Sequence, residues 1–218
     1  MPQETRQHPD KPNYFQIFEQ VGIPTEYEKT KPDLITLKDY YSCPVFILGG
    51  GPSLPDDLAK VDIKKGIAIS VNHHAFKLVT PDYMVFQDAP EHQDNSEFNK
   101  LITGSCPCPK ISPRIKHTDY YCVNEYPFDE RISDSGRFAV WVASYISTGP
   151  IYLLGIGLRD PREPMHFYIK PDKVGAEWGG PPMNRKIEQW LNIISKVQNQ
   201  IIAVSGPLSE YFPLNPKV

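Results

Sequence analysis

Short apolar runs alternate with polar segments along most of this chain. Four runs are almost wholly apolar and lead into glycine or a polar side chain: residues 44–48, 67–71, 82–86 and 150–155. Because they lack the alternation of half-exposed strands, they are typical of strands buried on both faces of a sheet. Three further segments are strand candidates: residues 110–112, 119–123 and 200–204.

Helical patterns lie between these runs. Residues 135–147 are apolar nearly all round, which predicts a buried helix, and residues 184–199 carry an apolar stripe at helical spacing. Shorter helices are expected at three other places: residues 13–22, 54–61 and 91–100. Two segments that contain several glycines and prolines are expected to be loops: residues 103–114 and 159–182.

The alternation of strands and helices predicts an α/β fold, in which a Rossmann-like, mostly parallel sheet has helices on both faces. With 218 residues, the chain is long enough for one sizeable core. We expect a Rossmann-like nucleotide-binding domain over residues 43–218, after a partly disordered N-terminal extension over residues 1–42. In such sheets ligands bind beyond the carboxyl ends of the strands. The polar residues that follow the apolar runs are therefore the candidates for a site.

Composition and charge narrow the classes of partner. The net charge is -3 and the pI is about 6.1, so binding of nucleic acid by charge alone is not expected. A local basic groove would still allow DNA as an acceptor. The sequence has no apolar run of the ~18 residues that a membrane span needs, and it shows no secretory signal. We therefore expect a cytoplasmic protein with reduced thiols.

Two cysteines raise the question of zinc. Cys106 and Cys108 could act together with Cys122 and His117. The gap of one residue differs from the usual spacing of zinc ligands, and only one such pair occurs. We expect no metal here, and the sequence leaves the role of Cys106 and Cys108 open.

The first apolar run leads into a glycine loop. Its candidate nucleotide-binding residues are Gly49, Gly50, Gly51, Pro52 and Ser53. Glycines let the backbone turn sharply and let a ligand approach the amides, and Ser53 could cap a helix whose N-terminus faces an anion. The loop is neither a Walker A motif nor a Gly-x-Gly-x-x-Gly fingerprint. The alternative is a tight strand-to-helix turn that binds nothing.

Polar residues also follow the next predicted strands. The Asn72 side chain can donate and accept hydrogen bonds, which suits a ribose or phosphate, or it can serve a turn. The Asp88 carboxylate could hold Mg²⁺ or a sugar hydroxyl, or it could cap a helix. Ser135 and Gly136 open the predicted buried helix and could form a second anion site. The alternative there is simple capping by Asp134 or Ser135.

His166 and Tyr168 are the remaining catalytic candidates. A neutral histidine can take a proton from an attacking hydroxyl near pH 7, and Tyr168 could donate to a leaving phosphate. A histidine in a surface loop without any role is the alternative. Four cations in the same loop could close over phosphates or could simply be solvated: Arg159, Arg162, Lys170 and Lys173.

The order of these motifs resembles two groups of nucleotide-dependent transferases. The motifs are residues 45–54, 70–72, 81–88, 135–136 and 151–156, His166, and residues 211–214. In this order they look like the 6-hydroxymethylpterin diphosphokinase-like family, and most are similar to the bacterial sialyltransferases of glycosyltransferase family 42. Residues 81–88 look more like the diphosphokinase-like group, and residues 211–214 look like the sialyltransferase ending. The chain departs from both groups at Gly157, where they tend to carry an acidic residue. It departs from the sialyltransferases at Gly50, where they tend to carry asparagine.

The resemblance implies a nucleotide-dependent transferase, and we favour an enzyme. The leading hypothesis is a glycosyltransferase that uses a nucleotide-sugar donor and a small-molecule or glycan acceptor, with His166 as general base and Tyr168 at the leaving phosphate. The first alternative is a diphosphokinase that uses ATP and Mg²⁺ on a small alcohol, with Asp88 at the metal. The second is a non-catalytic nucleotide-binding protein that uses the same glycine loop.

Overall fold

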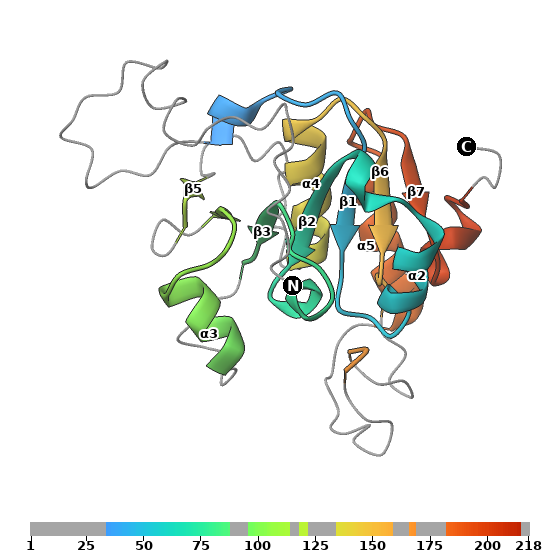
Figure 1. The fold of residues 1–218 in the computed structure, drawn as a ribbon. Coiled ribbons are helices and arrows are strands. Elements are labelled where there is room, and N and C mark those ends of the chain that lie inside the picture. Colours follow the sequence, from blue (N-terminus) through green and yellow to red (C-terminus); the bar gives the residue numbers. More distant parts are fainter. Residues whose placement is uncertain are drawn as a thin grey trace.

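The computed structural model describes residues 34–87, 96–113, 118–121, 134–158, 166–168 and 182–214. Within these residues the chain forms a seven-stranded sheet in which every neighbouring pair is parallel (Figure 1). The strands are β1 Val45–Leu48, β2 Ile67–Val71, β3 Tyr83–Val85, β4 Lys110–Ser112, β5 Tyr120–Tyr121, β6 Ile151–Leu154 and β7 Ile201–Ala203. All seven coincide with predicted strands, so the expected α/β sheet is confirmed.

The strand order is β5-β4-β3-β2-β1-β6-β7. The chain first builds the sheet in one direction from β1 to β5, and it then returns to place β6 on the other side of β1. Val45 accordingly pairs with Ile67 of β2 on one side and with Ile151 of β6 on the other. The point between β1 and β6 is the topological switch point, where open α/β sheets bind their ligands.

Helices cover both faces of the sheet, as the sequence predicts. The α-helices in the described part of the chain are α2 Leu54–Lys60, α3 Ser96–Thr103, α4 Ser135–Ile146 and α5 Met183–Ile194. In Figure 1, α2 lies in front of the sheet, whereas α4 and α5 lie behind it. Short 3-10 helices complete the connections: Leu34–Leu37, Ile63–Lys65, His74–Lys77 and Pro207–Glu210.

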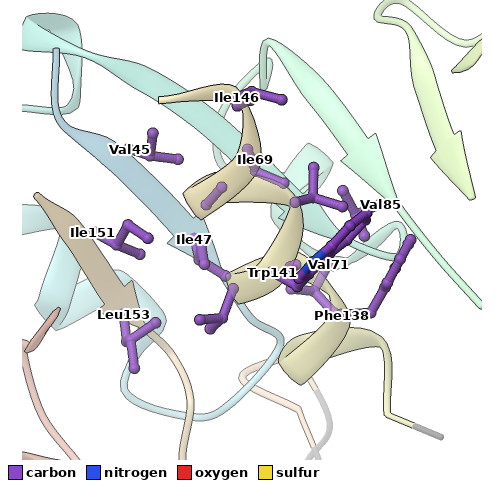
Figure 2. Close-up of a cluster of buried hydrophobic side chains, with 14 of the residues drawn as sticks. Val45, Ile47, Ile69, Val71, Val85, Phe138, Trp141, Ile146, Ile151 and Leu153 are labelled. Carbon is purple, nitrogen blue, oxygen red and sulfur yellow. The ribbon is translucent and has the colours of Figure 1, made fainter. Parts of the chain in front are cut away.

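The core has two layers because successive side chains of a strand point to opposite faces. Val45 and Ile47 belong to the larger cluster, in which α4 packs its apolar side chains on β1, β2, β3 and β6 (Figure 2). Phe46 and Leu48 point to the other face and pack with Leu54 of α2. Burial on both faces explains why these strands are continuously apolar in sequence.

Two segments that are not strands of the sheet pack on the core and on one edge of the sheet. Tyr41 is buried in the larger cluster, and its hydroxyl lies 2.6 Å from that of Tyr83 on β3. Residues 34–41 thus pack on the domain, and the predicted boundary near residue 43 stays a prediction. At the other end of the sheet, Ala203 of β7 forms an isolated parallel bridge with Pro213, and its N–H donates to the Phe212 carbonyl at 2.7 Å.

Some boundaries differ from the predictions. Residue 103, assigned to a loop, is the last residue of α3. The helix predicted over 184–199 ends at Ile194. The N–H groups of Lys196 and Val197 bond to carbonyls three residues back, so the final turn tightens while Val197 stays packed on the core.

Several predictions lie outside the described residues. These are the disordered start, the helix at 13–22, most of the 159–182 loop, and Asp88. Among the helices that the structure does describe, none has the length and apolar character needed to cross a bilayer.

Candidate functional site

The glycine loop lies at the switch point, where β1 and β6 approach each other closely. The Gly49 N–H donates to the Leu154 carbonyl at 2.8 Å, and the Gly51 N–H donates to the Gly155 carbonyl at 2.8 Å. A Cβ added at Gly51 would lie 2.6 Å from the Gly155 oxygen, and one at Gly49 would meet the same atom. The two glycines are therefore needed for the close passage of the β6 backbone.

This bonding changes the predicted role of the loop. The sequence suggests that consecutive amides are presented to a phosphate, but Gly49 and Gly51 use theirs within the protein. Pro52 has no N–H to offer. In this conformation, at most the N–H groups of Gly50 and Ser53 can bind a phosphate. Any anion site here is thus smaller than the sequence suggests.

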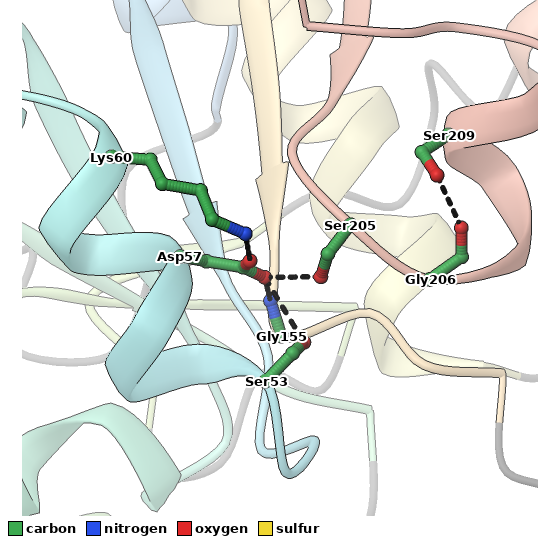
Figure 3. Close-up of polar contacts among 7 residues, drawn as sticks. All are labelled: Ser53, Asp57, Lys60, Gly155, Ser205, Gly206 and Ser209. Carbon is green, nitrogen blue, oxygen red and sulfur yellow. Dashed lines mark hydrogen bonds and ion pairs between the residues drawn. The ribbon is translucent and has the colours of Figure 1, made fainter.

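A buried carboxylate holds the loop in place. Asp57 of α2 is fully buried, and its Oδ2 accepts hydrogen bonds from Ser53 Oγ at 3.0 Å, the Gly155 N–H at 2.9 Å and Ser205 Oγ at 2.7 Å (Figure 3). Lys60 Nζ lies 3.4 Å from the other oxygen. One side chain therefore joins the start of α2 to the carboxyl ends of β6 and β7.

The predicted capping by Ser53 is wrong in its detail. Its side chain makes no capping bond to α2, because the hydroxyl donates to the Asp57 carboxylate instead. Sequence reasoning missed Asp57. The available signal was its position: it lies three residues after Leu54 and beside Leu58, on the apolar stripe of the predicted short helix.

Asn72 ends β2 in an unusual conformation. Its φ is 55°, in the left-handed region that asparagine tolerates better than most residues. Its N–H donates to the Val85 carbonyl at 2.9 Å, and its own carbonyl accepts from Ser70 Oγ at 2.7 Å. The side-chain Oδ1 is buried, and no donor among the described residues reaches it. A buried acceptor left in this way costs free energy, so it indicates a missing partner such as a ligand hydroxyl or N–H.

Three aromatic rings from distant parts of the chain meet near Gly50. The His74 and His166 rings stack with centroids 3.9 Å apart, and the Tyr168 ring stacks 5.4 Å from that of His166. A Cβ added at Gly50 would lie 2.7 Å from atoms of both histidines. The Tyr168 hydroxyl lies 2.8 Å from His74 Nδ1 and 3.3 Å from His73 Nε2. We call His73, His74, His166 and Tyr168 the histidine–tyrosine cluster.

Backbone and charge contacts fix this cluster. The Phe167 N–H donates to the Gly50 carbonyl at 3.1 Å, which anchors residues 166–168 on the glycine loop. The Lys77 ammonium lies 4.7 Å from the centre of the Tyr168 ring, a cation–π distance. Lys77 also pairs with Glu97 of α3 at 2.7 Å. The cluster therefore depends on the glycine loop, on α3 and on the turn after β2.

Burial keeps the histidines of the turn neutral. The pKa of His74 is lowered to about 2, mainly by burial and also by the nearby His166, His73 and Lys77. Burial also lowers the pKa of His73, although the Glu97 charge acts in the opposite direction. At neutral pH both imidazoles are uncharged, so each has one donor and one acceptor nitrogen.

The tyrosine stays protonated over the same range. Burial, and then the Glu97 charge, raises the pKa of Tyr168 to about 12. Its hydroxyl can therefore donate one hydrogen bond at neutral pH, to a neighbouring imidazole or to an incoming oxygen. That donor property is the one required of a group that steadies a leaving phosphate.

The structure gives Ser135 and Gly136 a different role from the predicted anion site. The Asp134 carboxylate accepts from the Gly136 N–H at 2.7 Å and from the Arg137 N–H at 3.4 Å, so a protein side chain caps α4. Ser135 Oγ accepts from the Gln87 N–H at 3.2 Å. A Cβ at Gly136 would lie 3.0 Å from the Trp190 ring, so helix packing explains this glycine. The capping alternative is confirmed for Asp134.

The described residues were examined for groups of side chains that could bind a metal ion. Among the described residues, no three histidine, cysteine, aspartate or glutamate side chains are grouped to hold a metal ion. Asp88, Cys122 and His117 lie outside those residues. A role of Asp88 with Mg²⁺ therefore stays a prediction.

The chain is similar to known proteins in its structure rather than in its sequence. No protein-family profile and no curated protein sequence matches the chain. A similar solved structure is the MAf glycosyltransferase from Magnetospirillum magneticum AMB-1, with a TM-score of 0.50 and 16% identity. The match covers 81% of this chain but 34% of that one, so this chain spans about a third of that protein. Another is the alpha-2,3-sialyltransferase from Campylobacter jejuni in its apo form, with a TM-score of 0.48, 18% identity and 80% coverage of each chain.

At these identities the likeness concerns the fold. The chain has a glycosyltransferase-like α/β fold, in agreement with its parallel sheet and its helices on both faces. Nothing in the comparisons supports the diphosphokinase-like family that the motif order also resembles.

Proposed function

We propose that this protein is a nucleotide-dependent transferase that moves a sugar from a nucleotide-sugar donor to a small-molecule or glycan acceptor. The observation that carries the proposal is the histidine–tyrosine cluster on Gly50, beside the switch point of the sheet. This cluster contains His166 and Tyr168, the catalytic candidates that the sequence nominates together. The glycosyltransferase-like fold supports the same class of reaction.

The donor lies across the carboxyl ends of β1 and β2. Its phosphate accepts from the Gly50 and Ser53 N–H groups, which β6 leaves available. A ribose hydroxyl donates to Asn72 Oδ1, the buried acceptor at the end of β2. This pairing removes the cost of the unsatisfied oxygen on binding, so Asn72 contributes to affinity.

The transfer requires one proton acceptor and one hydrogen-bond donor. The acceptor hydroxyl attacks the anomeric carbon and gives its proton to His166, while the bond from that carbon to the phosphate oxygen breaks. The nucleotide leaves with the bonding electrons. Tyr168, which is protonated at neutral pH, donates a hydrogen bond to the leaving oxygen.

Binding is tested by thermal unfolding with CMP, UDP, GDP, ATP and cyclic nucleotides. A ligand at a hundred times its Kd should stabilise the protein by about 2.7 kcal/mol and raise Tm. Asn72→Gly removes the amide but permits the left-handed backbone, so it should keep Tm and lose most of the ligand-induced shift. Gly157→Ala is the matched control, because a Cβ there meets nothing within 4 Å. Absence of a shift with every nucleotide would contradict the proposal.

Turnover is tested with the donor that binds best. His166→Ala should abolish transfer but retain nucleotide affinity, and added imidazole should restore part of the rate if the ring acts as a base. Tight binding without turnover would favour the non-catalytic nucleotide-binding protein. Release of AMP that depends on Mg²⁺ would favour diphosphoryl transfer instead.

A further inference from the structure

Two cysteines lie close together on the loop between α3 and β4. Cys106 and Cys108 flank Pro107, and their Sγ atoms are 3.8 Å apart without a disulfide between them. The two sulfurs are in contact, whereas a disulfide needs about 2.05 Å between them. The two thiols are thus near bonding distance in the folded protein.

The two thiols differ in access. Cys108 is buried with 7% exposure and packs in a cluster with Met84, Phe86 and Phe98. Cys106 is only half-buried. Both cysteines line an open cavity of about 250 Å³, together with Pro107, Pro109 and Asp119. A small molecule can therefore reach Cys106 first, with Cys108 directly behind it.

The surroundings of Cys106 favour its thiolate. The pKa of Cys106 is lowered to about 7, mainly by a hydrogen bond from the Cys108 side chain and also by the Lys110 charge. Burial and the Asp119 carboxylate oppose this effect. Near neutral pH, Cys106 is therefore more often in the nucleophilic thiolate form than an ordinary cysteine.

We propose that Cys106 and Cys108 form a redox-active dithiol that exchanges with small-molecule disulfides. The Cys106 thiolate attacks one sulfur of a disulfide such as oxidised glutathione, which forms a mixed disulfide and releases one thiolate. Cys108 then loses its proton to solvent and attacks Cys106 Sγ, which releases the second thiolate and forms the Cys106–Cys108 disulfide. The protein loses two electrons and two protons, and the small disulfide gains them.

This inference is independent of the proposed transferase activity. The proposal rests on the 3.8 Å between the two sulfurs and on the cavity that both cysteines line. The arrangement also matches the usual division of labour in such pairs, with an accessible attacking thiol and a shielded second thiol.

The test treats the full chain with oxidised glutathione and maps the products by peptide mass spectrometry. The wild type should lose two hydrogens within one peptide that contains both cysteines, and dithiothreitol should reverse the change. Cys108→Ser should stop at the mixed disulfide on Cys106, and Cys106→Ser should react at least about tenfold more slowly. Cys43→Ser is the matched control and should behave like the wild type.

A second measurement follows alkylation of Cys106 against pH in the Cys108→Ala and wild-type proteins. The wild-type midpoint should lie near 7 and rise when the Cys108 hydrogen bond is lost. A mixed disulfide that persists in the wild type would overturn the proposal. So would a bond from Cys106 to Cys43 or Cys122, or equal reactivity at Cys43 and Cys106.

Discussion

Two imidazole rings leave no room for a side chain at Gly50. Because His74 and His166 lie where a Cβ would point, any larger residue must displace one of them. This is a requirement of side-chain packing rather than of backbone conformation. It links the glycine loop directly to the residues that we propose act on the substrate.

Gly50→Ala should therefore lower the free energy of unfolding by about 1–3 kcal/mol, the usual cost of overpacking a filled site. Urea unfolding measures this change. The free energy of unfolding of Gly157→Ala should lie within about 0.5 kcal/mol of the wild-type value, once the lower conformational entropy of its unfolded chain is taken into account. The same Gly50→Ala protein should show weaker donor turnover, because the His166 ring is moved. Equal stability of the two variants would contradict the arrangement of the cluster.

His74 predicts how stability depends on acid. The folded state holds its pKa at about 2, whereas an unfolded histidine titrates near 6.5, so the unfolded state binds the additional proton first. The contribution is present in full above pH ~6.5 and is lost as the pH falls, at about 1.4 kcal/mol per pH unit. The groups that face the ring are His73, His166, Lys77 and Tyr168.

The measurement is the free energy of unfolding at pH 7.5 and pH 5.5, for the wild type and for His74→Gln. The wild type should lose roughly 1–1.5 kcal/mol more than the variant over this interval. A steeper loss in His74→Gln would show that the ring is charged in the folded protein.

At the scale of secondary structure elements, Asp57 explains how α2, β6 and β7 keep their relative positions. The three hydrogen bonds to Oδ2 replace the water that a carboxylate loses on burial. Two of the donors are hydroxyls that can rotate, whereas the Gly155 N–H is fixed by a backbone with φ of 65°. The backbone bond is therefore the one that a substitution damages most.

Asp57→Ala should destabilise the protein by about 2–4 kcal/mol, because it leaves the buried Gly155 N–H without an acceptor and creates a cavity. Asp57→Asn should cost less, since its carbonyl oxygen can still accept from that N–H. Asp56→Asn changes an exposed neighbour on the same helix and should be nearly neutral. Chemical denaturation gives the free energy of unfolding of the three variants. An Asp57→Ala protein as stable as the wild type would contradict the proposed role of Asp57.

The elements themselves were largely predictable from sequence. Burial on both faces forces the central strands to be continuously apolar, and that pattern located β1, β2, β3 and β6, whereas β4 lies in a segment whose prolines and glycines predicted a loop. Much of the site was not predictable in detail. Neither the bond from Ser53 to Asp57 nor the use of the Gly49 and Gly51 amides by β6 follows from local sequence, because both depend on which strand lies beside β1.

The cluster shows the same limit. His74 and His166 are 92 positions apart in sequence, and only the topology of the chain brings their rings to one place. The sequence places His166 in a predicted loop and gives no sign that its ring lies beside that of His74. Their stacking, and the hydroxyl of Tyr168 between His73 and His74, required the three-dimensional structure.

For the whole molecule, the described part of the parallel sheet ends at β5 on one side and at β7 on the other. Among the described residues, β5 comprises Tyr120–Tyr121. β7 is longer and is followed by a segment that bridges Ala203 through Pro213. Because the Pro213 nitrogen carries no hydrogen, this outermost position cannot donate to a further strand.

The bridge thus acts against polymerisation. Restoring a donor with Pro213→Val should promote end-to-end association of sheets, visible as mass growth in light scattering at high protein concentration. Pro207→Ala, a proline replacement at the nearby 3-10 helix, should remain like the wild type. Pro213 pairs with Ala203 but has no N–H to offer to a further strand. The sheet therefore ends at a defined width on this side, which favours separate molecules over fibres.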